Sequence, residues 1–100
     1  MMTYEQFLLT KLAEECAEVQ KIALKTQQFG MDSIEPGQPF TNREQLYKEL
    51  NDVSASITML NTEVAGFSFS SNQNEIMHKI RKVEKFYRAS LALGFVGPKG

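Results

Sequence analysis

Apolar residues recur every three or four positions in three stretches of this chain, and each stretch is followed within two residues by a glycine. Such spacing lines the apolar side chains along one face of an α-helix, and glycine is a common helix terminator. We expect helices over residues 4–28, 42–65 and 73–93. Because consecutive helices usually pack antiparallel, the sequence predicts an all-α fold, an antiparallel helical bundle of three main helices completed by oligomerisation.

Capping signals support two of these boundaries. Thr41 precedes the second predicted helix with Glu44 three residues later, and Asn72 precedes the third with Glu75 in the same relation. The connection 31–40 contains two prolines and a glycine, so it cannot continue a helix. It is either a mobile lid or an ordinary surface loop.

Length and charge narrow the possible functions. The 100 residues are enough for a single domain spanning 1–100. A formal net charge of -1 argues against a nucleic-acid partner, and no stretch approaches the roughly 20 apolar residues that a membrane span requires. The first residues do not resemble a signal peptide, and Cys16 is the only cysteine. We therefore expect a cytoplasmic protein.

Two acidic pairs occupy positions where a solvated acid is not expected. Glu15 falls within the apolar stripe of the first predicted helix, and Glu18 lies one turn further along it. Glu49 and Asp52 repeat this spacing on the shoulder of the second stripe. If the two helices pack antiparallel, the four acids can face one another. Burying unpaired carboxylates is costly, so a cation should meet them.

The residue types indicate which cation would suit such a cluster. Oxygen ligands alone favour Mg²⁺, or Mn²⁺, whereas zinc prefers cysteine or histidine. Two alternatives stay open at this point. Each acidic pair could belong to a solvated helix face, or the charge could be neutralised by Lys11, Lys25 or Lys79.

The two acidic segments together resemble a known signature. EECAE at 14–18 and ELND at 49–52 are similar to the EExxE…ExxD motif of the all-alpha nucleoside triphosphate pyrophosphohydrolases, in their small, single-domain, MazG-like form from phages and bacteria. The segment 79–87 resembles the basic, tyrosine-ended segment of MazG-like members. The chain departs from the family in a longer interval between the two halves, which the connection 31–40 explains. It also departs at Val83, where relatives often place asparagine.

The resemblance implies an enzyme that hydrolyses nucleoside triphosphates to the monophosphate and pyrophosphate. It implies Mg²⁺ held by the four acids of the two pairs, with Glu14 orienting or deprotonating the attacking water. Lys79 and Lys82 are the implied phosphate ligands. Because relatives are dimers or tetramers, we expect a homodimer or homotetramer.

Two alternative functions remain at this stage. One is the same chemistry on a specialised substrate, such as dUTP or phosphoribosyl-ATP, since no specificity pocket can be read from the sequence. The other is a catalytically inactive helical interaction module that binds a partner through its helix faces.

Overall fold

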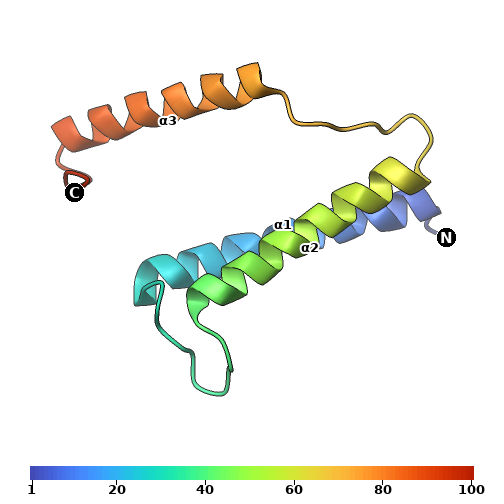
Figure 1. Ribbon diagram of the computed structural model, residues 1–100, viewed down its shortest axis with the longest axis horizontal. Helices are drawn as coiled ribbons and strands as arrows, with labels where there is room; N and C mark the ends of the chain where they lie inside the picture. The colour runs from blue at the N-terminus through green and yellow to red at the C-terminus, as the bar shows by residue number, and fades with distance from the viewer. The chain divides into compact units, whose positions relative to one another are not determined.

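The computed structural model describes residues 1–100 and contains three α-helices and no strand (Figure 1). The helices are α1 (Tyr4–Phe29), α2 (Asn42–Glu63) and α3 (Gln73–Ala92). The all-α prediction is confirmed, and each boundary lies within two residues of its predicted position. The chain divides into two compact units, Met1–Phe69 and Ser70–Gly100. None of the helices combines the length and the apolar character needed to cross a membrane.

Helices α1 and α2 form an antiparallel hairpin, and they lie side by side along their lengths (Figure 1). Leu8, Ile22 and Leu60 are its buried apolar residues. The other residues of the predicted stripes are less well covered, and Leu50 is 47 % exposed. The hairpin therefore has a thin core between its two helices and leaves further apolar surface on its outer faces.

The connection between α1 and α2 is fastened at its base to both helices. Gly30, with φ of +100°, ends α1, and its carbonyl accepts a hydrogen bond of 3.0 Å from Asn42 Nδ2. The backbone N–H of Asn42 donates to the carbonyl of Ser33 at 2.9 Å, and that of Arg43 to the carbonyl of Met31 at 3.0 Å. The structure thus shows a tied surface loop with a short two-residue bridge between Ile34 and Thr41.

The two ends of α2 are held by side chains. At its start, Thr41 Oγ1 accepts from the Glu44 N–H at 3.1 Å, and the Glu44 carboxylate accepts from the Thr41 N–H at 2.9 Å. This is the predicted capping box. Near its end, Asn61 Nδ2 donates to the Phe69 carbonyl at 3.1 Å, while Asn61 Oδ1 accepts from the Phe69 N–H at 2.8 Å. That second fastening was not predicted from the sequence.

We expect Thr41→Ala to lower the free energy of unfolding by about 1 kcal/mol, because the Glu44 N–H loses its acceptor. Thr41→Ser should retain most of the stability, since it keeps the hydroxyl. Urea unfolding followed by circular dichroism measures both variants. Equal stability of Thr41→Ala and the parent chain would show that the capping box contributes nothing.

The second unit consists of α3 and the C-terminal residues. Asn72 Oδ1 accepts from the Glu75 N–H at 3.0 Å, which forms the expected N-cap. The hydroxyl of Tyr87 donates to the Gly97 carbonyl at 3.3 Å and accepts from the Lys99 N–H at 2.7 Å, so it ties the last residues to the helix. No residue of α3 is buried within its own unit, and Phe86 is 74 % exposed.

Candidate metal centre

Three acids of the two predicted pairs meet across the helix hairpin. Glu15 comes from α1, and Glu49 and Asp52 come from α2. One carboxylate oxygen of each lies within 4.8 Å of those of the other two. Glu15 and Glu49 are half-buried and Asp52 is exposed. The antiparallel packing of α1 on α2 and the three-residue spacing on α2 bring together these three of the four predicted ligands. We call these three residues the acidic cluster.

Glu18, the fourth predicted ligand, is exposed and lies outside the acidic cluster. Its charge still reaches the cluster. The pKa of Glu49 is raised above its ordinary value, first because partial burial disfavours the ionised form. Negative charge then adds to this effect, from Asp52 and, more weakly, from Glu18 and Glu15. The acids therefore crowd one another electrostatically.

No lysine or arginine forms an ion pair with the acidic cluster or with Glu18. Lys11 pairs with Glu14 at 3.1 Å, and Lys25 pairs with Glu35. The remaining ion pair joins Arg43 to Asp32 at 3.3 Å. Lys11 and Lys25, two of the lysines that could have neutralised the acids, are thus engaged elsewhere. The third, Lys79, belongs to the second unit.

The donor set of the acidic cluster fits a hard divalent cation. Oxygens bound to one octahedral Mg²⁺ at about 2.1 Å lie roughly 3 to 4.2 Å apart. The observed limit of 4.8 Å is slightly wider, so a small side-chain rotation would bring the three oxygens to that spacing. Neither histidine nor cysteine belongs to the group, which disfavours zinc. Glu15, Glu49 and Asp52 could therefore hold Mg²⁺ or Mn²⁺, with Glu18 alongside.

A polar trough and an apolar groove adjoin the acidic residues. The polar trough, of about 460 Å³, is bordered by Glu18 and Glu49 and carries Lys21 and Lys25 on the same wall of α1. The apolar groove, of about 390 Å³, has Glu15 and Asp52 among its lining residues. Its apolar part is formed by four side chains, Phe7, Leu8, Ala55 and Met59. The trough therefore holds the unpaired amine of Lys21 and the amine of Lys25, which is paired with Glu35.

The other predicted site residues lie apart from the acidic cluster. Glu14 is exposed on α1 and is ion-paired with Lys11. Lys79 and Lys82 are exposed on α3, in the second unit. Lys21 and Lys25 line the polar trough beside Glu18 and Glu49, a placement that was not predicted from the sequence. Their spacing carried the signal, because they follow Glu18 by three and seven residues on one helix face.

Comparison of the chain with protein-family models, with curated proteins and with solved structures finds no match. A relation to the pyrophosphohydrolases is therefore a proposal from the resemblance of the two acidic motifs and of the basic segment of α3. The convergence of Glu15, Glu49 and Asp52 is an observation of this chain that does not depend on that relation.

Proposed function

We propose that this protein is a cytoplasmic, Mg²⁺-dependent hydrolase, also able to use Mn²⁺, that converts nucleoside triphosphates to the monophosphate and pyrophosphate. The observation that carries the proposal is the convergence of Glu15, Glu49 and Asp52 within 4.8 Å, without an ion-pair partner. The adjoining polar trough supports it, because Lys21 offers positive charge for a phosphate chain beside the acids, and Lys25 lines the same trough in an ion pair with Glu35.

The acids and the lysines have different proposed roles toward the phosphates. Mg²⁺ held by the acidic cluster and Glu18 would supply positive charge to the phosphate oxygens during the displacement. The Lys21 and Lys25 ammonium groups would donate hydrogen bonds to the same phosphates from the trough wall. Lys79 and Lys82 stay proposed as phosphate ligands on the strength of the motif resemblance.

The attacking water needs a group that orients it and takes its proton. Glu14 is proposed for this role, since it immediately precedes Glu15 and its carboxylate is exposed. Its present partner is the Lys11 ammonium at 3.1 Å. Exposed ion pairs of this kind are weak, so Glu14 can exchange Lys11 for water at little cost.

A substrate panel tests the proposed function. The full chain is incubated with the eight common NTPs and dNTPs, dUTP and phosphoribosyl-ATP, with Mg²⁺ or with EDTA. Pyrophosphate and the monophosphate are then quantified. We expect equal amounts of the two products from at least one substrate, and none with EDTA. Release of inorganic phosphate and a diphosphate would place the cleavage at the wrong bond. No turnover of any compound would refute the proposal and favour an interaction module.

We also propose that the chain forms a homodimer or homotetramer. Both units expose large apolar side chains, among them Leu50 and Met59 on α2 and Phe86 on α3. Monomers rarely leave large contiguous apolar patches in contact with water. Sedimentation equilibrium at micromolar concentration should give a mass of two or four chains. A mass of one chain across the concentration range would contradict this expectation.

A further inference from the structure

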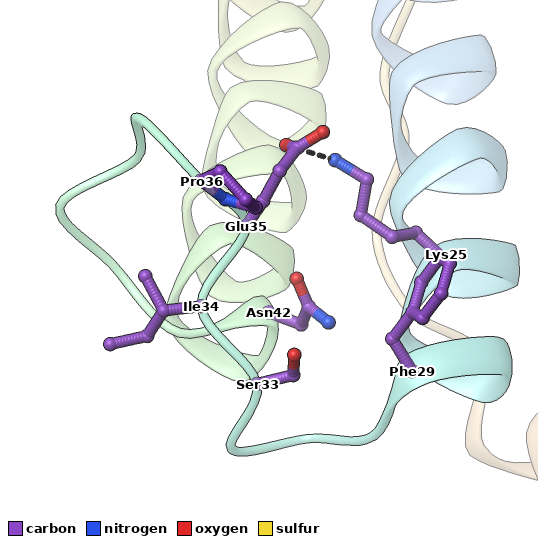
Figure 2. Close-up of a pocket in the computed structure, with 7 residues that line it drawn as sticks. All are labelled: Lys25, Phe29, Ser33, Ile34, Glu35, Pro36 and Asn42. Atoms are coloured by element: carbon purple, nitrogen blue, oxygen red, sulfur yellow. Dashed lines mark hydrogen bonds and ion pairs between the residues drawn. The ribbon is translucent and has the colours of Figure 1, made fainter.

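A separate cavity of about 230 Å³ lies where α1 ends and α2 begins (Figure 2). We call it the loop pocket. Lys25 and Phe29 line it from the last turns of α1, and Asn42 lines it from the first residue of α2. Residues 33–36 of the connection form the remaining wall. Its walls are thus partly apolar, with an aromatic ring, an amide and an ammonium group among them.

The amide of Asn42 leaves one hydrogen-bonding group unused in this pocket. Asn42 is 1 % exposed, and its Nδ2 donates to the Gly30 carbonyl at 3.0 Å. Its Oδ1 is buried and has no partner. The orientation of the amide is fixed, because turning it over would set Oδ1 against the Gly30 carbonyl. A buried acceptor without a donor is unfavourable and is rare in folded proteins. It would be satisfied by a ligand that presents an N–H group.

The ion pair between Lys25 and Glu35 connects the loop pocket to the polar trough. Both residues line both cavities. In Figure 2 the pair bridges α1 and the connection, and the Asn42 oxygen points toward it. The side chains of Lys25 and Glu35 are 23 % and 42 % exposed, so the pair is partly open to water. Access from the trough to the buried acceptor of Asn42 would require these two side chains to separate.

We propose that the loop pocket receives the nucleobase of the substrate, with a base N–H donating to Asn42 Oδ1. This inference rests on the proposed function, since it places the phosphates at the acidic cluster and in the polar trough. Asn42 and Glu49 are seven residues apart on α2, or about 10 Å of helix rise, and the base and the ribose together would span this interval. The phosphates do not suit the loop pocket, because their oxygens accept hydrogen bonds and Asn42 Oδ1 is itself an acceptor. Every natural base carries an N–H donor, and Phe29 offers it a ring face for stacking.

Nucleosides without phosphate test this assignment independently of catalysis. Adenosine, cytidine, guanosine and uridine are titrated to about 10 mM into the ¹⁵N-labelled full chain without divalent ions, a range suited to the weak affinity of so small a ligand. We expect at least one of them to shift the Asn42 side-chain amide and the backbone amides of residues 33–42. The analogue of that nucleoside with its base N–H groups methylated should bind about tenfold more weakly, which is the effect of one hydrogen bond.

Two variants separate the acceptor from the structural role of Asn42. Asn42→Ala and Asn42→Asp both remove the amide donor to Gly30, but only Asn42→Asp keeps an oxygen in the pocket. Asn42→Ala should bind the nucleoside about tenfold more weakly than Asn42→Asp, and methylation should no longer matter in it. Equal affinity of the two variants, shifts confined to the apolar groove around Phe7 and Met59, or no shift at all, leaving only water in the pocket, would each overturn the proposal.

The outcome is distinguishable from that of the proposed function. Nucleoside binding without hydrolysis of any triphosphate would support base binding in the loop pocket and refute the proposed enzyme activity. Mg²⁺-dependent hydrolysis by a chain that binds no nucleoside through Asn42 would support the enzyme activity and refute base binding in the loop pocket.

Discussion

Glu15→Gln and Asp52→Asn should each lower the rate of pyrophosphate release by about a hundredfold or more. Each change removes one of the three anionic oxygens that lie within 4.8 Å of one another and leaves the side-chain shape intact. Initial rates at several Mg²⁺ concentrations measure the effect and reveal whether excess ion compensates. Helical content by circular dichroism should not change, because Glu15 is only half-buried and Asp52 is exposed.

Glu63→Gln is the matched control for these variants. It removes the same unit of negative charge from an exposed position on α2, outside the acidic cluster. Its rate should stay within about twofold of the parent chain, because exposed charges at a distance are screened by salt. Parent-like rates in both Glu15→Gln and Asp52→Asn would mean that the acidic cluster is not the catalytic centre.

The contribution of Glu49 to the stability of the metal-free protein should fall as the pH rises above about 4.5, because the pKa of Glu49 is raised in the folded chain. The sign follows from proton binding. In that window the folded chain holds the Glu49 proton more tightly than the unfolded chain, so ionisation costs more in the folded state. Glu49→Gln should therefore be more stable than the parent at pH 7 in EDTA and should lose this part of the pH dependence. Urea titrations between pH 4 and 8 measure it.

Divalent ions should offset the loss of stability that ionised Glu49 causes at neutral pH. At an Mg²⁺ concentration ten times its Kd, binding adds about 1.4 kcal/mol to the free energy of unfolding. This corresponds to a rise in Tm of roughly 5 to 10 °C for a chain of this size. Glu49→Gln should show less than half of that rise, and Glu63→Gln all of it. If neither Mg²⁺ nor Mn²⁺ raises the parent Tm at pH 7, the acidic cluster does not bind these ions.

The helices could be predicted closely because their ends are encoded locally. Thr41 with Glu44, and Asn72 before the third helix, are short-range signals that one sequence shows directly. The fastening of Phe69 by Asn61 joins residues eight apart and carries no such local signature. The periodicity of α3 shows that it has an apolar face. Periodicity in one sequence does not tell which surface covers that face, so the assembly of a three-helix bundle stays a prediction.

The acidic residues of the candidate site could be predicted from the sequence, whereas the cavities beside them could not. Helical spacing places Glu15 on the inner face of α1, and the same spacing turns Glu18 about 60° away, which explains why it stands apart. The loop pocket could not be foreseen. It depends on how the connection folds back over Asn42, and the bonds from Asn42 and Arg43 to backbone carbonyls of the connection are set by its path.

Those same bonds close the connection near its base, and residues 36–39 form no hydrogen bond or ion pair with α1 or α2. Insertions or deletions within residues 36–39 should therefore not alter the register of α1 and α2 that sets Glu15 opposite Glu49. The number of residues between the two acidic motifs can then differ from one related chain to another. A search that demands a fixed interval would overlook chains built on this plan.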